Sequence, residues 1–372
     1  MNKLSIILCL AFFSFSAKSA DPVRQLMEDR LKPVGKNPVH SIQVYISGPE
    51  KIIREAVGFS DGAKLPSQTG NQFKIASITK MFTAVVILQL QEEGLLNTND
   101  KIGQFLDQNH PARVEELHFY KGKSYGNKLT IRQLLEHRSG LADLFTDAQV
   151  RFYTRELTHK DYSWNSEKLI DQYYKYHLNK KAHFAPDSCY FYSDVNYFLL
   201  GMVIEKITGQ TLDQQFRKRI LEPLNMKNTF FEYYEPTPAE TNFAHSFLGK
   251  IDVTDKLNTS YDWAGGGLVS TTEDLSKFIQ GLFEGKLFRN KETLNQMIAV
   301  KMHTSKSGKI LGYGSGISQY IFNGDTYYGH AGFWGSLVAY CPAKKITFCG
   351  NINQVKPSFD THLFIEQLLS KF

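Results

Sequence analysis

The chain has 372 residues, of which 42% are hydrophobic and 22% charged, with a formal net charge of +6. That length allows one large domain or a domain with a sizeable insertion. The excess charge is small, and the Lys and Arg residues do not gather into one stripe, so we expect no nucleic-acid partner.

Residues 1–20 have the layout of a secretory signal peptide. Lys3 precedes an apolar run from Leu4 to Phe15, and small residues follow up to Ala20, with cleavage predicted after Ser19 or Ala20. Removing all twenty leaves 372 − 20 = 352 residues and a charge of 6 − 2 = +4. The run is too short to span a bilayer, and no later apolar segment approaches the required length. We therefore expect an exported protein, periplasmic or secreted, without a stable membrane anchor after cleavage.

Three cysteines, Cys189, Cys341 and Cys349, remain after that cleavage, which is an odd number for an oxidising compartment. At least one is expected to be a free thiol. A turn at Pro342–Lys345 would leave Cys341 and Cys349 out of direct opposition in a hairpin, so we expect no disulfide between them. The eleven histidines are scattered without His-Glu-x-x-His or Cys-x-x-Cys spacing, so we expect no metal and no other cofactor.

The N-terminal part predicts a helix followed by a strand hairpin. Residues 22–31 have apolar side chains at helical spacing, 41–47 alternate, and 52–59 form a second strand across a turn at Gly48-Pro49-Glu50. Residues 83–91 are too apolar and too many for one strand, so they predict a buried helix.

Ser77 and Lys80 fall at the start of this buried helix, within Phe73-Lys74-Ile75-Ala76-Ser77-Ile78-Thr79-Lys80. Residues three apart share a helix face, so the hydroxyl and the amine point into the same space. A serine becomes a nucleophile when a neighbouring base takes its proton, and a desolvated lysine can do so. The alternative is an N-cap serine and a surface lysine, which the helix dipole and the apolar neighbours of Lys80 disfavour.

Residues 93–261 predict mainly helices and loops, with helices at 130–137, 195–207 and 212–221. The run Gly265-Gly266-Gly267 lacks the Lys-Ser/Thr ending of a phosphate-binding loop, so it predicts a tight turn before a helix at 271–283.

The C-terminal part predicts strands at 313–321, 326–329, 336–341 and 346–351, and a closing helix at 359–369. Strands near both ends and a helical middle predict an α/β (α+β) fold. One sheet is expected from 21–92 and 262–372, with 93–261 inserted as a helical subdomain and the site at the junction.

Two further stretches carry candidate site residues. The phenol of Tyr192, in Tyr192-Ser193-Asp194, could bind both Lys80 and Ser77 and share the proton transfer, although most aromatic residues here must be packing and Asp194 also suits an N-cap. In His330-Ala331-Gly332-Phe333, the glycine would let a substrate approach the strand, and the Phe333 and Ser77 N–H groups would form an oxyanion hole. The alternative for this second stretch is a turn into a strand.

In their order and context, these motifs resemble the serine β-lactamase and penicillin-binding-protein superfamily. The most similar branch holds class C β-lactamases, D-alanyl-D-alanine carboxypeptidases and esterases. Ser77-Ile78-Thr79-Lys80 is similar to its Ser-x-x-Lys, Tyr192-Ser193-Asp194 to its Tyr-x-Asn, and His330-Ala331-Gly332 to its Lys/His-Thr-Gly. Supporting stretches are Glu136–Leu141, Tyr197–Gly201 and Gly266–Thr271.

The resemblance covers nearly all of residues 21–372 and implies a β-lactamase/transpeptidase-like fold, with an antiparallel sheet flanked by helices. It implies Ser77 as the acylated nucleophile and Lys80 as its activating amine, with Lys80, Tyr192 or the pair as general base. Asp194, His330, Ala331, Gly332 and Phe333 would then lie on the substrate and oxyanion side.

Two departures from the family bear on the substrate. Ala331 stands where the family has a threonine that binds a substrate carboxylate, and His330 replaces a permanent lysine charge. We therefore expect an exported serine hydrolase of an ester, amide or peptide, like a carboxylesterase or D-alanyl-D-alanine carboxypeptidase. Its partner would be a small-molecule or peptide acyl substrate, with peptidoglycan fragments among the candidates. A class C-type β-lactamase, a D-amino-acid peptidase and a non-catalytic cell-wall-binding homologue remain alternatives.

A competing motif, Gly58-Phe59-Ser60-Asp61-Gly62, matches the nucleophile elbow of α/β-hydrolases. That elbow needs a helix directly after the serine, whereas Pro66, Ser67 and Gly70 predict a loop there. Ser60 is therefore not expected to be a nucleophile.

Overall fold

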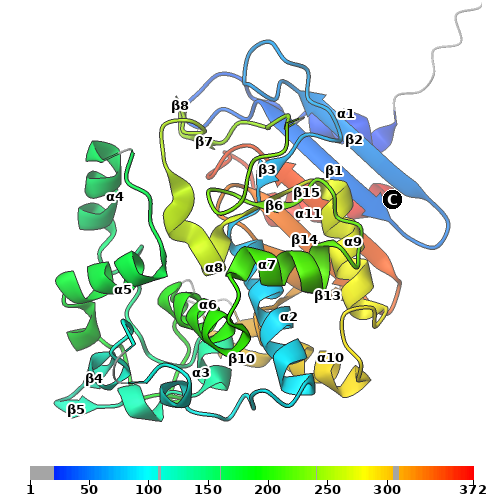
Figure 1. The fold of residues 1–372 in the computed structure, drawn as a ribbon. Coiled ribbons are helices and arrows are strands. Elements are labelled where there is room, and N and C mark those ends of the chain that lie inside the picture. The colour runs from blue at the N-terminus through cyan, green and yellow to red at the C-terminus, as the bar shows by residue number, and fades with distance from the viewer. Residues whose placement is uncertain (1–20, 108–109, 160, 240, 305–309) are drawn as a thin grey trace, which may run out of the picture.

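The computed structural model describes residues 21–107, 110–159, 161–239, 241–304 and 310–372. The predicted signal peptide lies outside the described residues. An eight-stranded antiparallel sheet dominates one side of the molecule (Figure 1), in the order β10-β11-β12-β13-β14-β15-β1-β2. Its strands are β1 Ser41–Ser47, β2 Ile52–Gly58, β10 Lys301–Thr304, β11 Ile310–Tyr313, β12 Ser318–Phe322, β13 Asp325–Ala331, β14 Ser336–Cys341 and β15 Ile346–Ile352.

The N-terminal hairpin completes this sheet, because β1 pairs with β15 in the register Ile42 to Ile352. The prediction of one sheet built from both ends of the chain, with a helical region between them, is confirmed.

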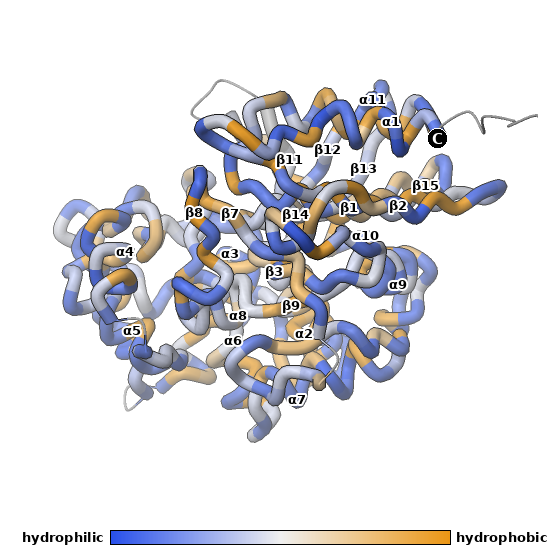
Figure 2. Tube along the Cα trace, turned by 90° about the horizontal axis from the view of Figure 1, so that it is seen from above, coloured by the Kyte–Doolittle hydropathy of each residue, from blue (hydrophilic) through white to orange (hydrophobic). Residues whose placement is uncertain are grey.

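Helices cover both faces of the sheet, as the view from above shows (Figure 2). Helix α1 (Pro22–Glu28) and helix α11 (Thr361–Lys371) bury their apolar side chains against one face. Helix α9 (Thr272–Phe283) packs on β1, β14 and β15 from the other side. The sheet therefore lies in the middle of three layers.

Helix α2 (Thr79–Glu92) runs through the centre of the larger core and is buried on nearly every side. A helix without a polar face can only be stable in such a position. Its Phe82 ring stacks on Phe278 of α9, with ring centroids 3.8 Å apart. This stack packs the N-terminal part of α2 against α9, which itself lies on the sheet.

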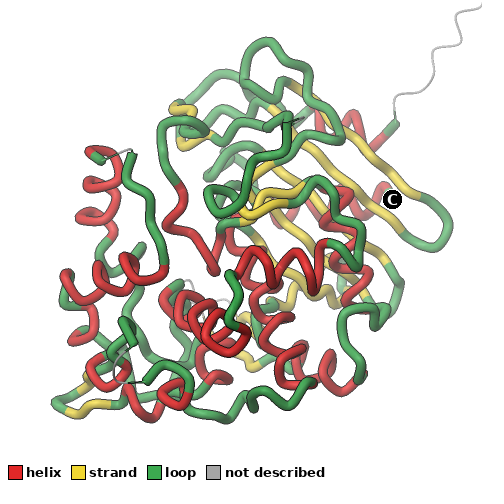
Figure 3. The backbone as a smooth tube through the Cα atoms, in the orientation of Figure 1, coloured by secondary structure: helices red, strands yellow, loops and turns green. Residues whose placement is uncertain are grey.

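The helical region lies beside the sheet, where Figure 3 shows red coils gathered away from the yellow strands. The remaining helices are α3 Ile131–Leu135, α4 Gln149–Thr158, α5 Ser166–Lys175, α6 Val195–Thr208, α7 Leu212–Phe216, α8 Trp263–Gly266 and α10 Lys291–Ile298. Seven short strands form three smaller sheets. One has three strands, in the order β3 (Phe73–Lys74), β9 (Leu268–Ser270) and β6 (Phe230–Phe231). The other two are pairs, β4 (Phe119–Tyr120) with β5 (Lys123–Ser124) and β7 (Phe247–Leu248) with β8 (Ile251–Asp252). The proposed limits of the insert, 93–261, stay a prediction.

Two local predictions are wrong. Residues 313–321 are not one strand, because β11 ends at Tyr313 and Gly316 adopts a φ of +74°. A Cβ at Gly316 would lie 2.6 Å from the Cβ of Ala84, so the turn packs its bare backbone against α2. The run Gly265-Gly266-Gly267 is not a plain turn either, since its first two glycines end the short helix α8.

The three cysteines of the described part are all free. Cys341 lies opposite Ile346 and Cys349 opposite Val338, which confirms that the two do not face each other across the hairpin. Within the same described ranges, no helix has both the length and the apolar character needed to cross a bilayer.

Candidate active site

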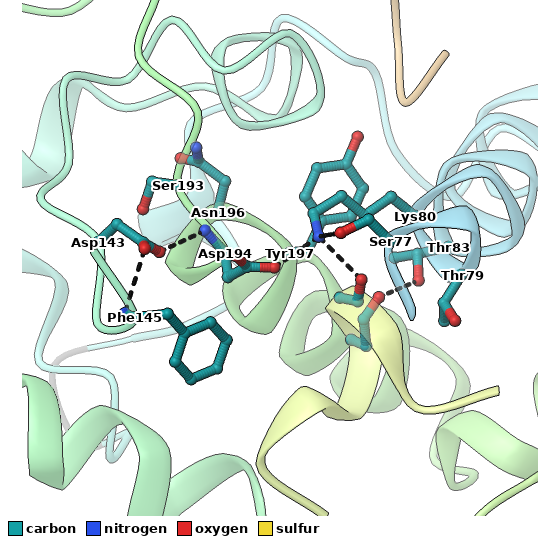
Figure 4. A network of polar contacts seen from close by, with 12 residues as sticks. Ser77, Thr79, Lys80, Thr83, Asp143, Phe145, Ser193, Asp194, Asn196 and Tyr197 are labelled. Atoms are coloured by element: carbon teal, nitrogen blue, oxygen red, sulfur yellow. Dashed lines mark hydrogen bonds and ion pairs between the residues drawn. The ribbon is translucent and has the colours of Figure 1, made fainter. Parts of the chain in front are cut away.

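Ser77 and Lys80 lie at the N-terminal end of the buried helix α2. Ser77 belongs to a single 3-10 turn, η1 (Ala76–Ile78), which leads directly into α2. Lys80 is fully buried, and its Nζ donates to Ser77 Oγ at 3.1 Å. Nζ also contacts Asp194 Oδ1 at 2.5 Å and the Gly265 carbonyl oxygen at 2.8 Å. The predicted pair is therefore in hydrogen-bonding contact, and three acceptors surround the amine (Figure 4).

The turn that carries Ser77 is held from two sides. Ile75 donates its N–H to the Leu268 carbonyl of β9, and its own carbonyl accepts from the Ser336 hydroxyl of β14 at 3.0 Å. Ala76 has a φ of +46°, a left-handed conformation that costs energy for any residue with a side chain. Strain of this kind persists only where the surroundings fix the backbone, so Ser77 is presented in one defined orientation.

Tyr192 lies against the same pair. Its ring centroid is 4.9 Å from Lys80 Nζ, and its phenol interacts with the Ser77 side chain. Burial, and secondly the charge of Asp194, raise the pKa of this phenol well above its usual value. Tyr192 is therefore a protonated phenol at neutral pH, which can pass a proton but is not a resident phenolate base.

His137 positions Tyr192 from behind. The two rings stack with centroids 4.1 Å apart. The Ser193 N–H donates to His137 Nδ1 at 3.1 Å, so the proton of the neutral ring is on Nε2. Burial, and then the charge of Lys80, hold the pKa of His137 well below its usual value. The uncharged ring therefore packs against the phenol of Tyr192, and a second polar contact, from Asn196 to Nδ1 at 3.0 Å, helps to hold it in place.

Asp194 stands at the start of α6 but does not cap it with its side chain. Its carboxylate turns to Lys80 instead, while its N–H donates to Asp143 Oδ1 at 2.7 Å. Asp143 also accepts from the N–H groups of Phe145 at 3.1 Å and Thr146 at 2.9 Å. Burial, followed by the nearby Asp194, raises the pKa of Asp143 to about 7. Figure 4 shows the continuous line from Asp143 through Asp194 to Lys80.

His330 lies at the end of β13 and is uncharged. Its Nδ1 is 2.7 Å from the Ala331 carbonyl oxygen, which can only accept, so Nδ1 carries the proton. Its Nε2 then accepts from the Tyr313 hydroxyl at 3.2 Å. Burial first, and then the charge of Lys80, lower the pKa of His330 to about 3. The ring is therefore neutral across the physiological pH range.

Ala331 is the last residue of β13, and Gly332 and Phe333 begin the connection to β14. A Cβ on Gly332 would overlap the Ile75 carbonyl oxygen and the Ser336 hydroxyl, so only glycine fits beside the Ser77 turn. Phe333 is 51% exposed and lines the same pocket as Ser77, and among the described residues no acceptor binds its N–H. Ala331 is exposed and borders a second pocket, between the sheet and α11.

A family model described as beta-lactamase matches residues 23–369 of this chain. The chain belongs to the beta-lactamase family. It is therefore a hydrolase of the serine type, as the resemblance of its motifs implied.

Known relatives span most of the chain. N-acetylmuramyl-L-alanine amidase of Bacillus subtilis (strain 168) is 26% identical over 375 residues, which cover 89% of this chain and 80% of the relative. Protein flp of Staphylococcus aureus (strain MW2) is 27% identical over 251 residues, which cover 66% of this chain but only 45% of flp. Among solved structures, the D-stereospecific amidohydrolase from Streptomyces sp. is 25% identical with a TM-score of 0.76, covering 92% of this chain and 97% of that one.

The candidate site opens into a pocket of about 220 Å³. This is below the ~300–1,000 Å³ typical of drug-sized ligand sites, so it suits a small acyl group. Its lining residues come from η1, the loop before α4 and α4 itself, the segment at the start of α6, the 3-10 turn 259–262, α8 and the β13–β14 connection. They are Ala76, Ser77, Asp143, Phe145, Thr146, Gln149, Tyr153, Tyr192, Asp194, Tyr261, Asp262, Gly265, Gly266, Phe333 and Trp334.

The structure brings the predicted residues Ser77, Lys80, Tyr192, Asp194 and Phe333 together around this pocket, with His330 and Gly332 directly behind it. Their catalytic and binding roles stay predictions. Ser60, of the competing motif, is buried after β2, and its N–H is bonded to the Leu65 carbonyl oxygen.

Three residues of the site were missed from the sequence, namely His137, Asp143 and Asp262. His137 belongs to the family-like stretch Glu136–Leu141, but no periodicity or spacing in the sequence indicates that it neighbours Tyr192. Asp143 lies in a loop and Asp262 at the end of a single 3-10 turn, places where an aspartate is ordinary. Their importance arises only when distant segments meet around the pocket.

Proposed function

We propose that the protein hydrolyses a small ester or amide through an acyl-enzyme on Ser77. The observation that carries this proposal is the 3.1 Å contact of Ser77 Oγ with the buried Lys80 amine at the wall of the pocket. A nucleophile and a base within hydrogen-bond reach, with the base oriented by a third group, is the arrangement that nucleophilic catalysis requires. Here the third group is Asp194.

The proton steps follow from the contacts. As Ser77 Oγ attacks the acyl carbon, its proton moves to Lys80 Nζ, while a proton of Nζ moves to Asp194 Oδ1 at 2.5 Å. The carbonyl oxygen becomes an oxyanion, which the N–H groups of Ser77 and Phe333 would stabilise. The leaving amine or alcohol takes the proton of the Tyr192 phenol, and Tyr192 regains one from Lys80. Water then attacks the acyl-enzyme by the reverse sequence, which releases the acid and restores Ser77.

Substrates with a carboxylate beside the scissile bond fit this site poorly. His330 is neutral, Ala331 offers no hydroxyl, and the charge of Lys80 is already paired with Asp194. β-Lactams and peptides ending in D-alanine carry such a carboxylate. An esterase or amidase is therefore favoured over a β-lactamase or a carboxypeptidase. The amidase names of the Bacillus subtilis relative and the Streptomyces structure support an amide among the substrates.

Labelling with a fluorescent fluorophosphonate tests the nucleophile. We expect the wild-type protein to label and Ser77→Ala to lose both labelling and turnover of p-nitrophenyl butyrate. Ser60→Ala is the matched control, because it removes the serine of the competing Gly-x-Ser-x-Gly motif, and it should label normally. Loss of labelling in Ser60→Ala alone would move the nucleophile to that motif. A wild-type protein that never labels would instead support a binding module.

The preference for substrates without a carboxylate is tested by comparing the hydrolysis of a panel of substrates by wild type and by Ser77→Ala. Short acyl esters and amino-acid amides should be hydrolysed at least ~10-fold faster, in kcat/KM, than nitrocefin or D-alanyl-D-alanine peptides. The physical reason is the missing cation for their carboxylate. Efficient hydrolysis of nitrocefin would contradict the proposed preference for esters and amides.

Export is part of the same proposal and is supported by the layout of residues 1–20. Mass spectrometry of the protein expressed with its full N-terminus should find a chain beginning at Ala20 or Asp21. A chain that keeps Met1 or Asn2 in the cytoplasm would refute it.

A further inference from the structure

The pocket next to Ser77 is acidic. Three of its lining residues are aspartates, Asp143, Asp194 and Asp262, and none of its described lining residues is Lys, Arg or His. Lys80 lies directly behind the wall, but its charge is opposed by Asp194 at 2.5 Å. A small, partly closed space with this balance attracts cations and repels anions.

Two of the three carboxylates already have partners. Asp194 is paired with Lys80, and Asp143 accepts four hydrogen bonds from Phe145, Thr146 and Asp194. Asp262 is different, because within the described residues no donor is bonded to its carboxylate. A mostly buried carboxylate without a donor is costly unless something else satisfies it.

The cost of burying this charge is reflected in the pKa of Asp262. Burial, and then the charge of Asp194, raise its pKa to about 7, against the opposing effects of Lys74 and Lys80. Among the described contacts, Lys74 does not hydrogen-bond Asp262: its Nζ binds Glu232 at 2.5 Å and the Thr259 hydroxyl at 2.8 Å. The carboxylate of Asp262 is thus left facing the pocket.

Asp262 lies close to the reacting serine. It ends the 3-10 turn η7 (Thr259–Asp262), directly before α8. A Cβ on Gly266 would lie 3.2 Å from Asp262 Cγ and 3.5 Å from the carbonyl carbon of Ala76. A side chain at position 266 would therefore contact both the Asp262 side chain and the Ser77 turn, and all three segments line the same pocket. The two groups are near enough to bind neighbouring atoms of one small substrate.

Aromatic rings complete the surroundings. Burial, and then the charge of Asp262, raise the pKa of both Tyr153 and Tyr261. These two rings line the pocket together with Phe145 and Trp334. Carboxylates flanked by aromatic faces are suited to an ammonium group, which gains both ion pairing and cation–π attraction. An anionic or purely apolar acyl group would gain neither.

We propose that Asp262 binds the protonated amino group of the substrate, so that the enzyme prefers aminoacyl amides and esters with a free amine beside the scissile carbonyl. The proposal rests on the proposed function and names its substrate class. It makes Asp262 a specificity-determining residue and leaves the proton steps to Ser77, Lys80 and Tyr192.

Competitive inhibition tests this subsite without assuming the natural substrate. Turnover of the uncharged p-nitrophenyl butyrate is measured at about pH 7.5, with phenylalaninamide of either hand or its N-acetyl derivative as competitor. The α-amine, with a pKa of ≈ 7.7–8.0, is then largely protonated. We expect the free-amine competitor to have an inhibition constant at least ~10-fold lower than the acetylated one. Acetylation removes the charge and keeps the side chain.

Asp262→Asn should reduce the ratio of the two inhibition constants to about one. Asp255→Asn is the matched control, because it removes an exposed carboxylate of the same segment outside the pocket, and the ratio should stay as in wild type. Fluorophosphonate labelling of Ser77 reports that each variant is folded. Equal inhibition by both competitors in wild type, or an unchanged ratio in Asp262→Asn, overturns the proposal.

Calorimetric titration of Ser77→Ala with the same two amides separates this proposal from the hydrolase function. Amine-selective binding without any turnover by wild type would defeat the hydrolase and keep the subsite. Ester turnover without amine selectivity would defeat the subsite and keep the hydrolase.

Discussion

Lys80→Met is expected to lower kcat by about three orders of magnitude or more on esters and amides alike. Methionine keeps most of the volume of the buried stem but cannot accept the Ser77 proton. General-base catalysis typically contributes 10²–10⁴-fold, and the serine is a poor nucleophile without it. The measurement is kcat for p-nitrophenyl butyrate and for an aminoacyl p-nitroanilide, with the melting temperature as a check of folding.

A structural role for Lys80 predicts a different outcome in a second variant. Lys80→Met alone leaves the Asp194 carboxylate without its cation, which can destabilise the site for reasons unrelated to proton transfer. The double variant Lys80→Met/Asp194→Asn removes that unpaired charge. We expect it to regain thermal stability and remain inactive. Recovery of turnover to within about tenfold of wild type would mean that the lysine holds the site together and does not act on Ser77.

The contact between Ser77 and Lys80 follows from local rules. Ser77 and Lys80 are three apart at the end of an apolar helix, and helix geometry alone brings hydroxyl and amine together. The strands at both ends were recognised by their alternation, and the antiparallel order followed from the family resemblance. The sheet joins β1 to β15 as that prediction required.

The broken strand and the missed site residues have long-range causes. Gly316 breaks a predicted strand because its backbone packs on α2, more than 200 positions earlier in the chain. Asp143 belongs to the site through the N–H of Asp194, and Asp262 because it lines the same pocket as Ser77. No single stretch of sequence contains such contacts. The chemistry of the motifs can therefore be predicted from the sequence, whereas the negative charge of the pocket depends on the tertiary structure.

That charge changes how the Asn-to-Asp departure is understood. From the sequence, Asp194 was one substitution in a Tyr-x-Asn element. In the structure it neutralises Lys80, while the neutral His330 supplies no second cation. Asp194 and the neutral His330 therefore act in the same direction, because both reduce the positive charge available to a substrate carboxylate.

Tyr192→Phe should separate amide from ester hydrolysis. The variant keeps the ring that stacks on His137, so the fold and the pocket wall stay in place. It loses the phenol proton, which the raised pKa keeps in place at neutral pH and which a leaving amine needs. We expect kcat on an aminoacyl p-nitroanilide to fall by about 10²-fold or more. On p-nitrophenyl butyrate the loss should be about tenfold or less, since p-nitrophenolate departs as an anion.

Tyr190→Phe is the control for this prediction, because its ring stacks on His303 at 3.6 Å in the same aromatic cluster but does not line the pocket. Both activities should stay within about threefold of wild type. An equal loss on ester and amide in Tyr192→Phe would assign the phenol to activation of Ser77, beside Lys80. The difference between the two substrates therefore decides whether Tyr192 gives its proton to the leaving group or helps to remove the proton of the serine.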